Sequence, residues 1–143
     1  GGSHGQQREY PMHCRSAKHP IVKGMPDNWI HGRDEMYDRM RGPANIKDLL
    51  YSGFADKATG GSGREEPLVF TVDYGKARVF HIMLGHAGPT LENNPAMQCA
   101  GFQTLVLRGA EWAATGKVKQ PLPTDFPTDK KPSFRLDYKQ PEK

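Results

Sequence analysis

The side chains most able to do chemistry in this sequence are histidines that lie beside glycines and carboxylates. The sequence contains six histidines in all. His4 lies in the segment GGSHG, where the small residues let the backbone approach a ligand closely. His86 follows Leu84 and Gly85 at the end of an apolar segment. Imidazole can hold a divalent metal ion that polarises a carbonyl or activates water, or it can transfer a proton near neutral pH. Both kinds of chemistry stay open at this point.

A second group, His31, Asp34 and Glu35, adds carboxylates to these histidines. On a helix, His31 and Glu35 would share a face at a spacing that is common among metal ligands. On a strand they would also share a face, but further apart. An ordinary solvated polar surface explains the same residues equally well.

The remaining candidates have plainer interpretations. The sequence indicates a core histidine at His81 and surface or turn residues at His13 and His19. Cys14 and Cys99 are too few for a four-cysteine zinc site and are best explained as small buried side chains. No G-x-S-x-G motif is present, and neither cysteine follows a strand into a tight turn, so the sequence disfavours nucleophilic catalysis by these residues.

The elements that would position these side chains can be predicted in part. Residues 10–15 are expected to form a strand, and residues 68–72 and 78–84 a β-hairpin around the turn at 73–76. Because both hairpin segments are apolar on both faces, we expect this sheet to be covered on both sides. A helix is predicted over 95–115, with Asn94 as its cap, Pro95 in its first turn and Gly116 at its end. Residues 29–41 and 46–54 fit either a helix or a strand.

Composition and charge limit the function classes. A mean hydropathy of -0.74 and the lack of a long apolar segment exclude a membrane-spanning helix. Of the formal charge of +4, +3 lies in residues 117–143, where seven Lys and Arg face four Asp and Glu. The remaining residues are nearly neutral, so no folded basic face for nucleic acid is expected. Residues 117–143 also hold five prolines and read as an extended, wrapping or disordered tail.

Five separated motifs give the sequence a family resemblance. In chain order they are GGSHG (1–5), HPIVKGMP (19–26), WIHGRDEMY (29–37), YGKARVFHIMLGH (74–86) and CAGFQTLVLRGAEWAATG (99–116). Together they resemble the trehalose utilisation, or ThuA-like, family over residues 1–116. The resemblance implies an α/β fold, a flavodoxin-like three-layer sandwich of the class I glutamine amidotransferase-like type, of which this chain is the C-terminal part, incomplete at the N-terminus. It also implies strands at 34–40 and 47–53, which weakens the helix interpretation of 29–41.

The resemblance further implies a role in bacterial carbohydrate catabolism, on trehalose or a related keto-sugar. We expect His86, His31 and Glu35 as catalytic groups, His4, His31 and His86 as ligands of a divalent metal such as zinc, and His4 and Asp34 as substrate-binding residues. Gly88 stands where amidotransferases of this fold carry a glutamate, so glutaminase activity is not expected. We expect His86, His4 and the 31–35 segment to meet around one cleft.

Two other interpretations stay open. One is a non-catalytic carbohydrate-binding or scaffolding module, and the other is a hydrolase whose nucleophile lies outside these residues. The expected partner is a small-molecule carbohydrate, without nucleic acid or membrane. A homo-oligomer is compatible with the sequence, and so is either a cytoplasmic or a secreted bacterial protein.

Overall fold

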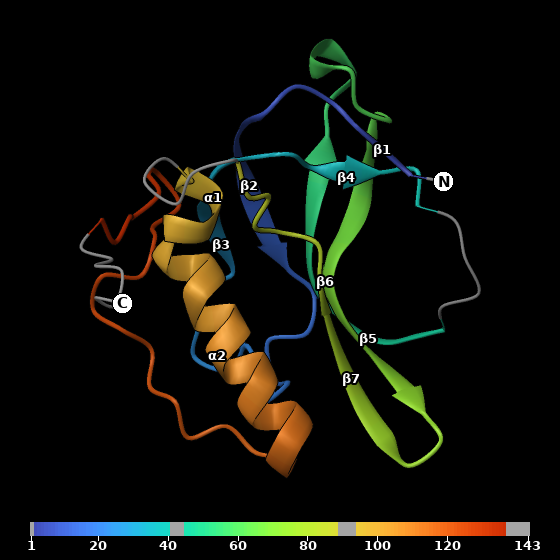
Figure 1. The fold of residues 1–143 in the computed structure, drawn as a ribbon, viewed down its shortest axis with the longest axis vertical. Helices are drawn as coiled ribbons and strands as arrows, with labels where there is room; N and C mark the ends of the chain where they lie inside the picture. Colours follow the sequence, from blue (N-terminus) through green and yellow to red (C-terminus); the bar gives the residue numbers. More distant parts are fainter. Residues whose placement is uncertain (1, 41–44, 89–93, 137–143) are drawn as a thin grey trace, which may run out of the picture.

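A five-stranded antiparallel sheet is the main element of the computed structural model, which describes residues 2–40, 45–88 and 94–136 (Figure 1). The strands lie in the order β3-β2-β5-β6-β7, so β3 and β7 form the two edges. Their bounds are β2 (Arg8–Cys14), β3 (Asn28–Asp34), β5 (Ile46–Ala55), β6 (Arg64–Tyr74) and β7 (Ala77–Ile82). A separate two-stranded ribbon pairs β1 (Ser3–His4) with β4 (Tyr37–Asp38), and a 3-10 turn, η1 (Lys57–Thr59), precedes β6.

Alternation of buried and exposed side chains explains why these segments are strands. In β2, Tyr10 and Met12 are buried whereas Glu9 and Pro11 are exposed, which is the period of two expected for a strand with one face on a core. The strand predicted at 10–15 is therefore confirmed. The helix interpretation of 29–41 is wrong for its described residues, because β3 and β4 lie there and Trp29 is fully buried within β3.

The predicted hairpin is confirmed, but its expected covering is not. Val72 lies opposite Val79 and Tyr74 opposite Ala77, with Gly75 at a φ of 59° in the connecting turn. The expectation that both faces of the hairpin are covered is wrong for β7, where Val79 is 38% exposed. His81, predicted to be a core residue, is exposed and stacks on Phe70 with ring centroids 4.5 Å apart.

The predicted helix forms, with an interruption. It consists of α1 (Pro95–Gln98) and α2 (Ala100–Thr115), separated by Cys99 in an extended conformation. Pro95 opens α1 and Gly116, at a φ of 75°, ends α2, both as predicted. Asn94 makes no capping hydrogen bond through its side chain; its Oδ1 accepts the N–H of Gly88 instead.

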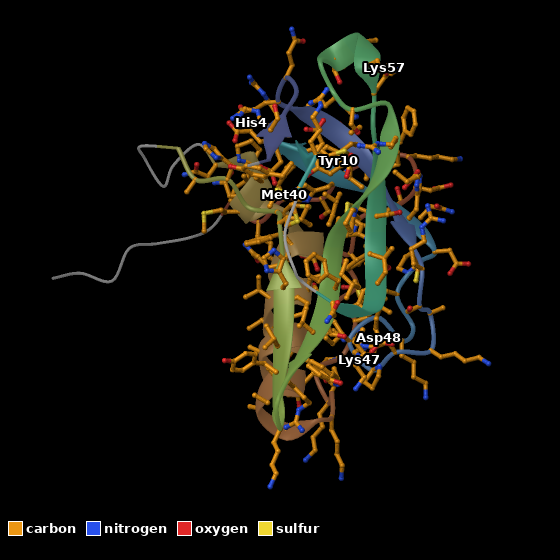
Figure 2. The ribbon with its side chains drawn as sticks, turned by 90° about the vertical axis from the view of Figure 1, so that its right-hand side faces the viewer. His4, Tyr10, Met40, Lys47, Asp48 and Lys57 are labelled. Carbon is orange, nitrogen blue, oxygen red and sulfur yellow. The ribbon has the colours of Figure 1, made fainter. Side chains whose placement is uncertain are left out.

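Helix α2 packs on one face of the sheet, and Figure 2 shows it behind the strands. Two glycines allow this close packing. A Cβ atom at Gly101 would lie 2.4 Å from Cζ3 of Trp29, and one at Gly109 would lie 2.3 Å from Cδ1 of Phe80. Helix α2 therefore packs directly against the rings of Trp29 in β3 and Phe80 in β7.

The fold agrees with the sequence-based class only in its coarser part. Strands and helices pack together as expected, but every strand pair among the described residues is antiparallel, and helices lie on one face of the sheet. The flavodoxin-like three-layer sandwich is therefore not confirmed. No helix within residues 2–40, 45–88 or 94–136 is long and apolar enough to cross a membrane.

The described part of the C-terminal segment, residues 117–136, runs back over the sheet edge (Figure 1). The N–H of Ile30 in β3 donates to the carbonyl of Thr128 over 2.9 Å, and the N–H of Ala100 donates to Ser133 over 2.9 Å. Phe126 packs edge-on against Trp29, with ring centroids 5.3 Å apart. The segment thus covers both the outer edge of β3 and the helix interruption at Cys99.

Candidate functional site

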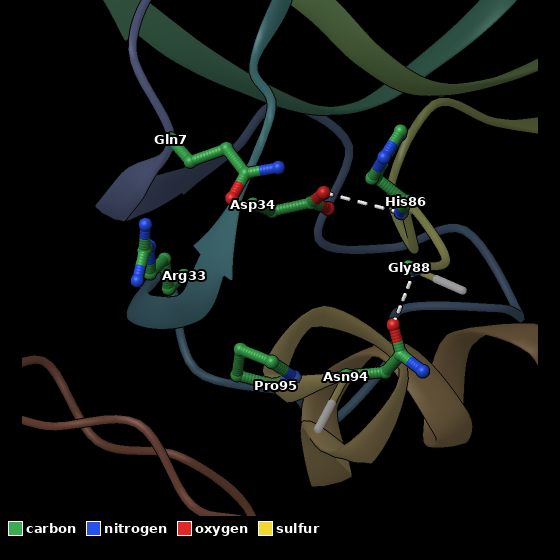
Figure 3. A pocket seen from close by; sticks show the side chains of 7 residues that line it. All are labelled: Gln7, Arg33, Asp34, His86, Gly88, Asn94 and Pro95. Atoms are coloured by element: carbon green, nitrogen blue, oxygen red, sulfur yellow. Dashed lines mark hydrogen bonds between the residues drawn. The ribbon is translucent and has the colours of Figure 1, made fainter. Parts of the chain in front are cut away.

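The site lies where the segments after the two edge strands of the sheet meet. Asp34 ends β3 at one edge, and Gly85 and His86 follow β7 at the other edge. The Asp34 carboxylate nevertheless accepts the N–H of Gly85 at Oδ2 over 2.7 Å. Its Oδ1 atom accepts the N–H of His86 over 3.1 Å (Figure 3). One aspartate at the end of β3 therefore holds the segment that follows β7.

Glycine at position 85 is required by this connection. Gly85 has a φ of 93°, a conformation that residues with a side chain rarely adopt. A Cβ atom there would also lie 2.5 Å from the ring of Phe102 in α2. The turn that directs His86 towards Asp34 thus depends on Gly85.

Glu35 is the centre of a polar cluster in which two histidines converge. Its Oε2 atom lies 3.2 Å from Nδ1 of His86 and 3.5 Å from Nε2 of His4. The Tyr37 hydroxyl donates to the same oxygen over 3.2 Å, while Nε2 of Gln7 donates to Oε1 over 3.4 Å. The Glu35 side chain is 12% exposed, so two imidazoles and a phenol share one largely shielded carboxylate.

The two histidines of this cluster differ in what their second nitrogen does. Nδ1 of His4 lies 2.9 Å from the carbonyl oxygen of Gly5. His4 therefore faces an acceptor on both nitrogens, and both contacts are hydrogen bonds only when the ring is an imidazolium. Nε2 of His86 has no partner among the described residues, and the side chain is 39% exposed. Of the two rings, His86 is the one with a nitrogen available to a ligand.

Tyr37 is fixed by both its backbone and its ring. In the β1–β4 ribbon, His4 lies opposite Tyr37, and their rings meet edge to face at 5.6 Å. Partial burial raises the pKa of the Tyr37 hydroxyl, and its hydrogen bond to the Glu35 carboxylate raises it further. This hydroxyl therefore stays protonated and acts as a donor to Glu35.

Two hollows of opposite character meet at His86. The first, of about 370 Å³, is polar and is lined by Gln7, Arg33, Asp34, His86, Gly88, Asn94 and Pro95 (Figure 3). The second, of about 320 Å³, is mainly apolar and is lined by Tyr37, Met40, Ile82, Met83, Leu84, Gly85 and His86. Each is at the small end of the range typical of small-molecule sites, ~300–1,000 Å³.

His31 lies behind the site rather than in it. Its ring is fully buried against Tyr10 and Trp29, and its Nε2 atom is 2.9 Å from Oδ2 of Asp34. Burial lowers the pKa of His31, but hydrogen bonds with Asp34 and with the Cys99 thiol outweigh it and raise the pKa overall. His31 can thus balance the charge of Asp34, but the structure gives it no access to a ligand in either hollow.

Cys99 is the residue of this region that sequence reasoning placed elsewhere, as a buried member of an apolar helix. It is buried, but at the interruption between α1 and α2. Burial raises the pKa of the thiol, whereas His31 and backbone N–H groups of Phe102 and Gly32 lower it, and the net change is downward. Only the position of Cys99 near the predicted start of the helix could have hinted at this.

The predicted metal site is not assembled. Among the described residues, no group of three or more His, Cys, Asp or Glu side chains is arranged to hold a metal ion. The proposed ligand set of His4, His31 and His86 is separated, because the ring of His31 is fully buried and bonded to Asp34. These residues therefore do not fit a zinc centre.

The structure brings together three of the predicted site residues, His4, Glu35 and His86, with Asp34 directly behind them. The sequence did not lead us to Tyr37, nor to three residues that line the polar hollow, Gln7, Arg33 and Asn94. The alternation of Glu35 and Tyr37 along a predicted strand could have indicated Tyr37. Nothing in the sequence indicated Gln7 or Asn94.

Comparisons with known proteins agree on one family. The family described as "ThuA: Trehalose utilisation" matches residues 1–113. A crystal structure of a ThuA-like protein from Parabacteroides merdae is similar to this chain at 66% sequence identity and a TM-score of 0.94. The alignment covers 99% of this chain and 50% of that protein, so the chain spans half the length of this relative. No curated protein matches the sequence.

Proposed function

Because the chain belongs to the trehalose utilisation (ThuA) family, we propose that it takes part in carbohydrate catabolism, acting on trehalose or a related keto-sugar through proton transfer by His86. The observation that carries this proposal is the contact between Nδ1 of His86 and Oε2 of Glu35, 3.2 Å apart, at the meeting point of two hollows. An imidazole held by a carboxylate on one nitrogen and open on the other is the usual arrangement of a general base.

In the proposed mechanism, Glu35 decides which nitrogen of His86 is reactive. When neutral His86 donates its Nδ1–H to Glu35, its Nε2 atom carries the lone pair that can accept a proton. A sugar hydroxyl, or a carbon next to a keto group, would give up its proton there. The imidazolium that forms is stabilised by the Glu35 carboxylate and can return the proton to the product.

The hollows supply the binding side of the proposal. Gln7, Arg33 and Asn94 offer amide and guanidinium groups that can hydrogen-bond sugar hydroxyls in the polar hollow. The apolar hollow, with Met40 and Met83, suits the less polar face of a ring or a substituent.

The flavodoxin-like three-layer arrangement stays part of the proposal for the family's complete domain.

The alternative function is a non-catalytic carbohydrate-binding or scaffolding module. Both hollows are small and open, which suits weak sugar binding. Weak sugar binding needs no reactive nitrogen, so the same site is compatible with a module. The two proposals differ in what His86 does once a sugar is bound, so one substitution separates them.

The test is a His86→Ala variant, compared with the unchanged protein for sugar binding by calorimetry and for product formation by NMR. The ligands are trehalose and the corresponding keto-disaccharide. If His86 transfers a proton, turnover should fall by about a hundredfold or more while binding changes little. Lost binding with no turnover in either protein would favour the module.

A matched control is His13→Ala. His13 also contacts a carboxylate through Nδ1, with Glu65 2.9 Å away, but this pair lies on β2 and β6 and lines neither hollow. The His13 variant should keep both binding and turnover. Full turnover in the His86→Ala variant would disprove the proposed role of His86.

A further inference from the structure

We infer that Asp34 is a positioning residue that fixes His86 and Glu35 relative to each other, and that it does not bind substrate itself. The inference rests on the proposed function only where turnover is the readout. Its structural part, that one carboxylate holds the backbone of both active groups, stands on the geometry of the described residues.

The first step of the argument is that the Asp34 carboxylate is saturated. It accepts four hydrogen bonds: from the N–H groups of Glu35 (2.8 Å), Gly85 (2.7 Å) and His86 (3.1 Å), and from Nε2 of His31 (2.9 Å). Two carboxylate oxygens offer about four acceptor positions. Although Asp34 borders the polar hollow, no acceptor position remains for a ligand, which argues against the substrate-binding role predicted from the sequence.

The second step concerns which groups these bonds hold. The N–H of Glu35 and the N–H of His86 bind to the same oxygen, Oδ1. Neither N–H has a backbone partner among the described residues, so Asp34 supplies their hydrogen bond. The 3.2 Å contact between His86 and Glu35 is thus set by a third side chain that contacts both residues through their backbone.

The third step is that Asp34 itself cannot move. Its side chain is 1% exposed, and the fully buried ring of His31 lies against it. A buried carboxylate is retained at such a position only when hydrogen bonds and an opposite charge compensate for its lost hydration. His31, whose Nε2 atom lies 2.9 Å from Oδ2 of Asp34, can supply that charge.

The experiment compares Asp34→Asn with Asp38→Asn by amide hydrogen exchange and by turnover. Asparagine keeps the size of the side chain but turns one acceptor oxygen into a donor, so two of the four bonds are lost. The N–H of Gly85 binds Oδ2 and the N–H of His86 binds Oδ1, so one of these two amides loses its acceptor. Exchange at that amide should accelerate by about tenfold or more, the effect of losing one charge-assisted hydrogen bond. Asp38 is equally buried but pairs with Arg39, and its variant should leave these two amides unchanged.

Turnover provides a second, separate readout. Asp34→Asn should lower turnover in the unchanged background and have no further effect in a His86→Ala background, because its influence passes through His86. If exchange at Gly85 and His86 is the same in Asp34→Asn as in the unchanged protein, the inference is wrong. If exchange accelerates but turnover is unaffected, positioning holds and the proposed function fails.

A measurement on the unchanged protein covers the case in which Asp34→Asn does not fold. The Gly85 and His86 amide protons should be shifted downfield and protected from exchange, although both residues lie outside regular secondary structure. Rapid exchange of these two amides in the folded protein would overturn the inference.

Discussion

Replacing Gly101 by alanine should destabilise the protein even though alanine is the better helix former. Gly101 lies in the first turn of α2, and a Cβ atom there would be 2.4 Å from Cζ3 and 2.7 Å from Cη2 of Trp29. Trp29 cannot move away, because it is fully buried and its ring is held by Tyr51 at 5.8 Å and by Phe126 at 5.3 Å.

The size of the effect follows from two opposing terms. Gly→Ala in a helix gains at most about 1 kcal/mol. Inserting a methyl group into a packed core costs about 1–3 kcal/mol, and the contact with a fixed indole places Gly101 at the upper end of that range. We therefore expect the free energy of unfolding to fall by about 2 kcal/mol, measured by urea denaturation followed by circular dichroism.

Gly109→Ala is the matched comparison in the same helix. Its Cβ atom would meet Phe80 at 2.3 Å, but Phe80 is half-buried and lies on the edge strand β7, which can shift. The loss should be smaller than for Gly101. A Gly101→Ala protein as stable as the unchanged one, or a larger loss for Gly109→Ala, would refute this account of how α2 packs.

Three further predictions concern the site and its surroundings. Hydrogen bonds with Asp34 and Cys99 raise the pKa of buried His31 above its ordinary 6.5. The stabilisation from protonated His31 is therefore complete below pH 6.5 and is lost as the pH rises through the folded-state pKa. Urea unfolding at several pH values should show this loss in the unchanged protein, and an identical profile in His31→Gln would contradict it. Glu35→Gln should lower the free energy of unfolding by about 1 kcal/mol or less, since both histidine contacts are partly exposed. The same substitution should lower turnover at least tenfold. A stability loss without loss of turnover would show that Glu35 only supports the fold. A thiol reagent should modify half-buried Cys14 in the native protein and buried Cys99 only in urea, as followed by mass spectrometry. Equal rates of modification of Cys14 and Cys99 in the native protein would show that the C-terminal segment does not shield Cys99.

The sequence was informative where a pattern is local. The strand at Tyr10, the turn at Gly75 and the helix limits at Pro95 and Gly116 all follow from rules that act over a few residues, and the structure confirms them. The interruption at Cys99 was missed because it is stabilised by a distant segment, through the hydrogen bond from Ala100 to Ser133. No local pattern carries that contact.

The candidate site was predictable from the sequence only in part. His4, Glu35 and His86 were identified by residue type and position, and they meet as expected. The separate position of His31 follows from the burial of its ring against Tyr10 and from its hydrogen bond to Asp34. The contact with Tyr10 joins two strands and cannot be deduced from the spacing of residues 31–35.

The hydrogen bond from Ile30 to Thr128 also has a consequence for the protein as it is being made. The two residues are 98 positions apart (128 minus 30), which at ~5–20 residues per second corresponds to roughly 5–20 s of translation. During that interval the nascent chain presents the outer edge of β3 without its closing partner, and an open strand edge is a template for pairing with another chain. Chaperones that shield emerging polypeptides would therefore be most needed in the time between synthesis of β3 and emergence of Thr128 from the ribosome.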